Sequence, residues 1–111
     1  MQPEVLKSLY DIKVSCDSIF EYLGEKRDFE SYLKNKQLRR AVERELEIIG
    51  EACNKILKIN PEIQIDQARK IVDARNWVIH GYDKVDDVII WSIISRDLIV
   101  LKMQVEKLIG S

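Results

Sequence analysis

The sequence is short of several residue types, and each shortage narrows what the chain can be. It has four Gly and two Pro among 111 residues, whereas 46% of its residues are hydrophobic and 33% are charged. This balance is typical of a folded helical protein and argues against a disordered chain. A chain of this length has room for one core and little more, so we expect a single domain over residues 1–111.

Long apolar runs are missing as well. The longest uncharged apolar stretch, Val88 to Ser95, is far shorter than the roughly 18 residues that a membrane span needs. The N-terminal segment contains Glu4, Lys7 and Asp11 where a signal peptide has an unbroken apolar region. We therefore expect a soluble, cytoplasmic protein that has no membrane partner.

Cysteine and histidine are scarce, which limits metal and redox chemistry. Cys16 and Cys53 are isolated and fall on apolar helical stripes, so we expect buried thiols and not a metal-binding or redox pair. With His80 as the only histidine, a zinc site would have to draw on scattered carboxylates. No phosphate-cradling Gly-rich loop is present either. The sequence predicts a site that uses neither a metal nor a cofactor.

An excess of charge of one sign is also missing, because the formal net charge is -1. Phosphate binding normally leaves a cationic footprint, so this balance argues against a strongly basic nucleic-acid platform. The basic residues nevertheless cluster in one segment, where Lys34 and Lys36 precede Arg39, Arg40 and Arg44. The sequence leaves open whether this segment presents a local positive face.

The first half of the chain carries the apolar periodicity of helices. Apolar residues recur at spacings of three and four from Val5 to Leu23, and Gly24 is well placed to end this helix. Asp28 can cap a short helix or helical turn. A longer helix is predicted from about Lys36 to Leu57, and it stops before Asn60-Pro61.

The second half continues the helical pattern. Asp66 is a natural N-cap for a helix that Gly81 is placed to terminate. Asp86 or Asp87 then caps a final helix. The apolar positions predicted for this final helix are Val88, Trp91, Ile94, Leu98, Leu101, Val105 and Leu108. No segment reads clearly as a strand, so we predict an all-α, up-and-down bundle of four to five helices.

Four residues near the end of the helix after Asp66 carry candidate chemistry. His80 is the candidate proton carrier, because the ordinary pKa of a histidine side chain, about 6.5, suits proton transfer near neutrality. Arg75 could hold a phosphate through two hydrogen bonds. Asn76 precedes His80 by four residues and can share its helix face. Tyr82 follows the expected helix end, where its hydroxyl could bond a phosphate, be chemically modified, or only pack over the terminus.

The angle between Arg75 and His80 is informative. On an ideal helix these positions differ by about 140°, so one straight helix does not aim both at a single small substrate. Either His80 leaves the regular helix near Gly81, or a second copy of the chain completes the site.

The string Arg75-Asn76-x-x-x-His80-x-Tyr82 resembles the R-x4-H-x-Y motif of the HEPN superfamily, specifically its HepT-like toxin branch. The segments 41–44 and 47–52 are similar to the central helix of that branch. The tail residues that also resemble it are Asp83, Val85, Trp91, Asp97 and Leu98.

This resemblance implies a HEPN-like helical domain that forms a homodimer or a higher oligomer, with the motifs of two protomers lining one cleft. It also implies a metal-independent endoribonuclease toxin that cleaves transfer or messenger RNA. The implied catalytic residues are His80 as acid and base, Arg75 as phosphate stabiliser and Asn76 as positioning residue. The implied partner is a minimal nucleotidyltransferase antitoxin that silences the toxin by attaching AMP to Tyr82.

Two other interpretations use the same residues. In the first, the polar cleft of a HEPN-like module binds a nucleotide or RNA without cleaving it. In the second, the chain is a purely structural helical dimer, in which Arg75, His80 and Tyr82 only cap a helix and form surface pairs.

Overall fold

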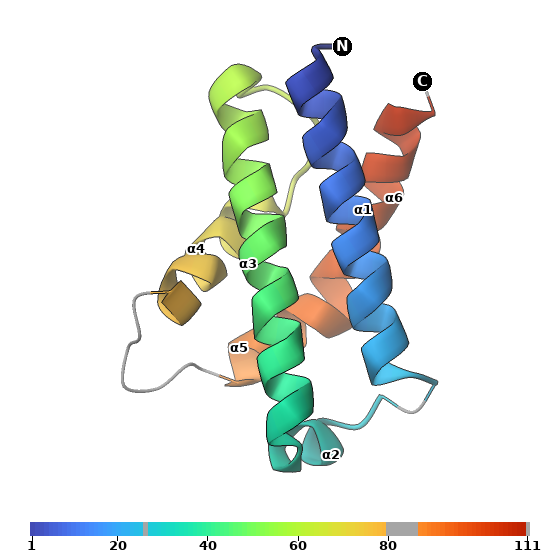
Figure 1. Ribbon diagram of the computed structural model, residues 1–111, viewed down its shortest axis with the longest axis vertical. Coiled ribbons are helices and arrows are strands. Elements are labelled where there is room, and N and C mark those ends of the chain that lie inside the picture. The colour runs from blue at the N-terminus through green and yellow to red at the C-terminus, as the bar shows by residue number, and fades with distance from the viewer. Residues whose placement is uncertain (26, 80–86, 111) are drawn as a thin grey trace.

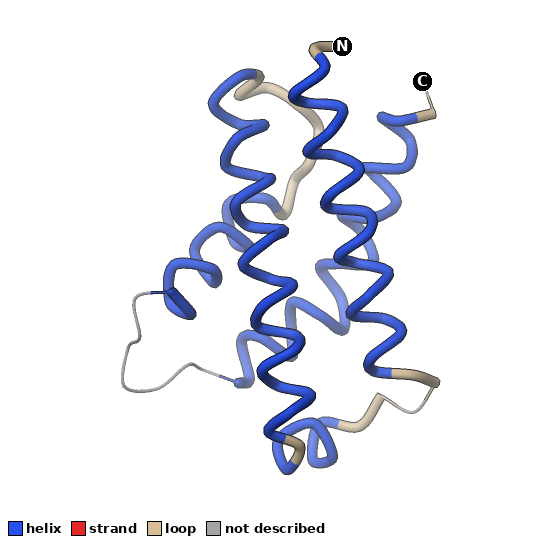
Figure 2. Tube along the Cα trace, in the orientation of Figure 1, coloured by secondary structure: helices blue, strands red, loops and turns tan. Residues whose placement is uncertain are grey.

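The computed structural model describes residues 1–25, 27–79 and 87–110, and describes residues 75–79 by their backbone alone. Within these ranges every regular element is a helix and no strand occurs (Figure 2). The predicted all-α class is therefore confirmed. No helix in the described ranges is both long and apolar enough to cross a membrane.

The first half of the chain forms an antiparallel pair of long helices. Helix α1 (Pro3–Leu23) and helix α3 (Lys36–Ile59) lie side by side and run in opposite directions (Figure 1). The short helix α2 (Phe29–Lys34) precedes α3 at the lower end of the bundle in Figure 1. All three helices lie where the apolar periodicity predicts them.

The ends of these helices follow from their capping residues. Gly24 adopts φ of 66°, a left-handed conformation that favours glycine, and its N–H donates to the Phe20 carbonyl as α1 ends. The Asp28 carboxylate caps α2 by accepting hydrogen bonds from the backbone N–H of Ser31 at 3.4 Å and from its hydroxyl at 2.8 Å. Helix α3 ends at Ile59, immediately before Asn60-Pro61. The predicted stops and the Asp28 cap are confirmed.

The second half of the chain returns twice along this pair. Helix α4 (Ala68–Ile79) packs on α3, and an uninterrupted helical segment then follows. That segment consists of α5 (Asp87–Ser92), the π-helical turn η1 (Ile93–Asp97) and α6 (Leu98–Ile109), which packs on α1. Counting it as one helix gives five helices within the described ranges. The long helices alternate in direction along the chain, as an up-and-down bundle requires (Figure 1).

Asp66 does not start α4 in the predicted way. The helix begins two residues later, at Ala68, and Asp66 exchanges two hydrogen bonds with Gln104 of α6. The backbone N–H of Asp66 donates to Gln104 Oε1 at 3.1 Å, and Gln104 Nε2 donates to the Asp66 carboxylate at 2.9 Å. A contact between residues 38 positions apart thus replaces the predicted local cap. Gly81 and Asp86 lie outside the described residues, and Asp87 lies in the first turn of α5.

The π-helical turn changes the face that the last helix presents to the core. In η1 the backbone N–H of Leu98 donates to the carbonyl of Ile93, five residues earlier, so this turn holds one residue more than an α-helical turn. A regular 3.6-residue period predicted Val88 to be buried, yet 64% of Val88 is exposed. Ile90 and Ile93 are fully buried instead. The prediction for Val88 was wrong because the wider turn shifts the phase of all residues that precede it.

The core lies along the seam between α1, α3 and the last helix, and it encloses both cysteines. Burial raises the pKa of Cys53 to about 12. Burial also raises the pKa of Cys16 to about 12, and the neighbouring Cys53 adds to this effect. Both side chains are fully buried free thiols, which confirms the prediction.

We predict that Cys16 and Cys53 are inert in the folded protein. At pH 8 a pKa near 12 leaves almost no thiolate, which is the reactive form. An aromatic disulfide reagent should therefore detect no thiol in the native chain and two thiols in guanidinium, as followed by absorbance. Rapid labelling of either cysteine without denaturant would contradict this burial.

Candidate active site

The predicted motif begins on α4 and continues past its end. The backbones of Arg75 and Asn76 belong to the last two turns of α4, which ends at Ile79. The side chains of these two residues are not among those described, and His80 and Tyr82 lie outside the described residues altogether. The structure thus fixes the helix that carries the start of the motif. The arrangement of Arg75 relative to His80 stays a prediction.

A groove lies beside this helix, between α4 and the segment formed by α5 and η1. Its volume is about 670 Å³, which falls in the range of ligand pockets. Its lining residues in the described ranges are Lys70, Asp73, Ala74, Val88, Ile89, Ser92 and Arg96. Ala74, Val88 and Ile89 supply an apolar surface, and the charged and hydroxyl groups supply the polar contacts.

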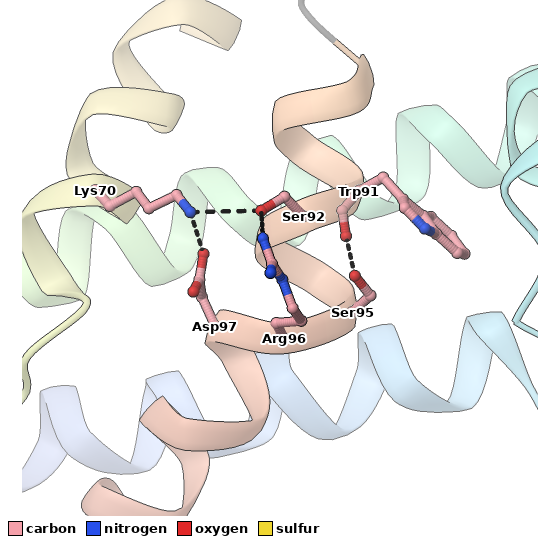
Figure 3. Close-up of polar contacts among 6 residues, drawn as sticks. All are labelled: Lys70, Trp91, Ser92, Ser95, Arg96 and Asp97. Atoms are coloured by element: carbon pink, nitrogen blue, oxygen red, sulfur yellow. Dashed lines mark hydrogen bonds and ion pairs between the residues drawn. The ribbon is translucent and has the colours of Figure 1, made fainter.

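Three polar residues of the groove, Lys70, Ser92 and Arg96, form a connected network with Asp97 (Figure 3). Lys70 of α4 pairs with the Asp97 carboxylate at 2.6 Å and donates to the Ser92 hydroxyl oxygen at 3.4 Å. Arg96 Nη2 donates to the same hydroxyl oxygen at 3.1 Å. Two cations therefore reach one neutral oxygen atom, and of the two only Lys70 has a carboxylate partner within the described ranges.

The π-helical turn explains how one lysine reaches both Ser92 and Asp97. These residues are five positions apart, which on an α-helix would separate their directions by about 140°. Hydrogen bonds from residue i to i+5 bring positions five apart onto one face, as i to i+4 bonds do for positions four apart in an α-helix. Ser95 stabilises the turn by donating its hydroxyl to the Trp91 carbonyl at 2.6 Å (Figure 3).

A second polar cluster lies where α5 begins. Arg39 of α3 pairs with Asp87 at 3.7 Å, and both side chains are largely buried. Burial raises the pKa of Glu43, and the nearby Asp87 carboxylate raises it further. Tyr32 also lies here: its buried hydroxyl has no hydrogen-bond partner among the described residues, and burial raises its pKa. Asp87 thus ties the start of the last helix to α3.

This cluster answers in part the question of a positive face near Arg39. The charge of Arg39 is paired with Asp87 and is partly withdrawn from solvent. Arg40 and Arg44 are exposed on α3. A positive surface on this segment can therefore draw on Arg40 and Arg44 far more than on Arg39.

Metal coordination gains no support from the described parts of the chain. No three His, Cys, Asp or Glu side chains within them lie together as metal ligands would. The metal-independent site stays a prediction, since His80 lies outside these residues.

The sequence does not predict the polar network of the groove. Ser92 and Arg96 have the i, i+4 spacing of neighbours on a helix face, which is the one local signal that was present. Nothing local indicates that Lys70, from another helix, meets them. The π-helical turn leaves no signature in the apolar pattern that would have revealed Asp97.

The chain was also compared with known proteins. A family model described as ribonuclease HepT-like matches residues 12–108. A protein of Methanocaldococcus jannaschii named as a putative RNase is 34% identical over 104 residues, covering 93% of this chain and 94% of the relative. A protein of Thermococcus cleftensis named as a probable ribonuclease HepT is 36% identical over 104 residues, covering 90% of this chain and 91% of the relative. No solved structure matches the chain significantly.

We predict that Glu43 makes the free energy of unfolding fall as pH rises. Its pKa in the folded chain is above the ordinary 4.5, so the folded state binds this proton more tightly than the unfolded state. The resulting stabilisation is complete below pH 4.5 and is lost as pH rises through the folded pKa. Glu43→Gln removes this loss. Urea unfolding measures the free energy of unfolding at pH 4 and at pH 7. From pH 4 to pH 7 this free energy should fall less, or rise more, for Glu43→Gln than for the natural chain.

The exposed loop residue Glu62 provides the matched control, since Glu62→Gln removes the same charge away from this cluster. If Glu43→Gln and Glu62→Gln change the difference between the two pH values equally, the environment assigned to Glu43 is wrong.

Proposed function

The chain belongs to the HepT-like ribonuclease family, and from this membership we propose that it is a metal-independent endoribonuclease toxin that cleaves cellular RNA. The observation that carries the proposal is the family match over residues 12–108, which includes the whole segment from Arg75 to Tyr82. Two relatives named as ribonucleases match this chain over nearly their full length. The substrate class is transfer or messenger RNA.

The residue types of the motif suffice for RNA cleavage without a metal. The 2′-hydroxyl of one nucleotide attacks the adjacent phosphorus, the bond to the 5′-oxygen breaks, and a 2′,3′-cyclic phosphate forms. His80 takes the proton of the attacking hydroxyl and returns a proton to the leaving oxygen. Arg75 stabilises the charge that develops on the phosphoryl oxygens. Asn76 positions the reacting groups.

The active unit is a homodimer in this proposal. Arg75 and His80 are about 140° apart on an ideal helix, so motifs from two protomers facing one cleft would bring complementary groups together. The described backbone supports the premise of this argument, because α4 is helical through Arg75 and up to Ile79, the residue before His80.

Regulation acts on the same segment. A minimal nucleotidyltransferase antitoxin transfers AMP from ATP to the Tyr82 hydroxyl and releases pyrophosphate. The attached phosphate adds negative charge and bulk beside the cleft, which repels and blocks the RNA backbone. Tyr82 is therefore the switch and not a catalyst.

We predict that the purified chain cleaves RNA in the presence of EDTA and that His80→Ala abolishes cleavage. Removing a general acid and base typically lowers a rate by about 10²–10⁴-fold. Gel analysis of product ends should show cyclic phosphates. Arg69→Ala serves as the control variant, because it changes an exposed cation of α4 outside the motif. Equal cleavage by the natural chain and His80→Ala would overturn the assignment. Binding of RNA without any cleavage would favour the alternative of a binding module.

We predict a mass increase of one or more AMP units on the chain after co-expression with its cognate nucleotidyltransferase, and no increase for Tyr82→Phe. Intact-mass spectrometry measures both. Tyr22→Phe is the matched control, since Tyr22 is exposed on α1 and its hydroxyl bonds Glu45 at 3.0 Å. AMP that persists on Tyr82→Phe would exclude Tyr82 as the modified residue.

A further inference from the structure

We propose that the groove between α4 and the α5–η1 segment binds one nucleotide of the RNA strand, next to the nucleotide that is cleaved. This inference rests on the proposed ribonuclease function and assigns it a substrate subsite. The lining residues of the groove that the structure describes all lie outside the motif. Its phosphate-binding groups are Arg96, Lys70 and Ser92.

Charge is the first argument. Among the lining residues that the structure describes, Lys70 and Arg96 are cations and Asp73 is a carboxylate, and Asp97 pairs with Lys70. Arg96 is exposed, and its hydrogen bond within the described residues goes to the neutral Ser92 hydroxyl. No carboxylate among the described residues pairs with Arg96, and a guanidinium can hold a phosphate through two parallel N–H···O bonds.

The geometry of the network is the second argument. The Ser92 oxygen accepts hydrogen bonds from Lys70 and Arg96, which uses its two acceptor sites and leaves its O–H as a donor. Two cations and one hydroxyl donor thus converge at one side of the groove (Figure 3). Asp97 already offsets the charge of Lys70, so a phosphate bound here would be attracted chiefly by Arg96, with Lys70 and Ser92 as further hydrogen-bond donors.

Contacts within the fold orient Lys70 and Ser92 toward the groove. Asp97, whose side chain is only 13% exposed, pairs with Lys70 at 2.6 Å and fixes the direction of its side chain. That pairing depends on the π-helical turn, and π-helical turns are frequent at functional sites. An ordered lysine and serine lose less side-chain freedom when a ligand binds than mobile surface residues would.

The apolar part of the groove suits a base. Ala74, Val88 and Ile89 line it beside the cations, and Val88 presents 64% of its surface. A volume of about 670 Å³ is more than a phosphate needs and can accommodate a nucleotide. An apolar surface beside paired cations therefore matches a base attached to a phosphate better than it matches an inorganic anion.

The position of the groove links it to the motif. Position 75 lies about 7.5 Å beyond Lys70 along the axis of α4 but about 140° around it, so the groove and position 75 are on different faces of the helix. Position 76 follows Asp73 by three residues, the spacing of neighbouring positions on one helix face. A strand held in the groove therefore lies beside the helix that carries the motif.

The test measures binding separately from cleavage. Fully 2′-O-methylated single-stranded RNA cannot form the cyclic phosphate, so its affinity for the full-length chain can be measured by fluorescence anisotropy across a range of salt concentrations. We expect Arg96→Ala to weaken binding by about tenfold. The slope of log affinity against log salt should fall by about 0.7, the value for one phosphate contact on a single strand.

Arg69→Ala is the matched control, because it removes the same charge from the other side of α4, where Arg69 lines a separate pocket with Asn54 and Leu57. It should change neither the affinity nor the slope. Arg96→Lys keeps the charge and should retain most of the salt slope with a weaker affinity. Circular dichroism verifies that each variant is folded, and Ser92→Ala provides a second variant that weakens binding without removing a charge.

Each outcome decides the proposal. If Arg96→Ala, Arg96→Lys and Ser92→Ala all bind like Arg69→Ala, the groove is not an RNA subsite. If free AMP binds as tightly as the RNA and depends on Arg96 equally, the groove serves a mononucleotide and the RNA assignment is overturned. Arg96-dependent RNA binding by a chain that does not cleave RNA would sustain this inference while the proposed function fails. If cleavage requires His80 but RNA binding does not depend on Arg96, the proposed function stands and this inference fails.

Discussion

The fold depends on the burial of the apolar face of α3, because two helices pack on it from different directions. Its fully buried side chains are Val42, Leu46, Ile49, Cys53 and Ile56. Helix α1 covers this face along most of its length, and α4 adds Ile71 and Ala74. The last helix then packs on α1. The position of α4, and with it the start of the motif, is therefore a consequence of α3 being covered on both sides.

Local information was sufficient for most of the helices, since apolar periodicity and capping residues act within one or two turns. Asp28 caps α2 because its carboxylate reaches an N–H only three residues away. Asp66 departs from its prediction because its partner, Gln104, is 38 residues distant. The exposure of Val88 has a different origin, because a widened turn in the same helical segment sets its phase. A distant partner explains the first departure, and a local change of helix type that the apolar period does not signal explains the second.

The candidate site also has one part that the sequence predicts and another part that it does not. The spacing of Arg75, Asn76, His80 and Tyr82 is readable in the sequence, and their roles stay a prediction. The groove is not readable, because it joins Lys70 to residues 22 and 27 positions later on another helix. The net charge of the chain does not reveal the groove either. The formal net charge of -1 counts Lys70 and Arg96 equally, whereas in the structure Asp97 pairs with Lys70 and not with Arg96.

The π-helical turn makes the last helix sensitive to length as well as to composition. A relative with one residue fewer between Ser92 and Asp97 could keep every apolar position of α6 and still rotate α5 by about 100° relative to it. Lys70 would then face a different pair of side chains. An insertion or deletion inside this helix would therefore change the residues that face Lys70, even where the percentage identity between two relatives stays high.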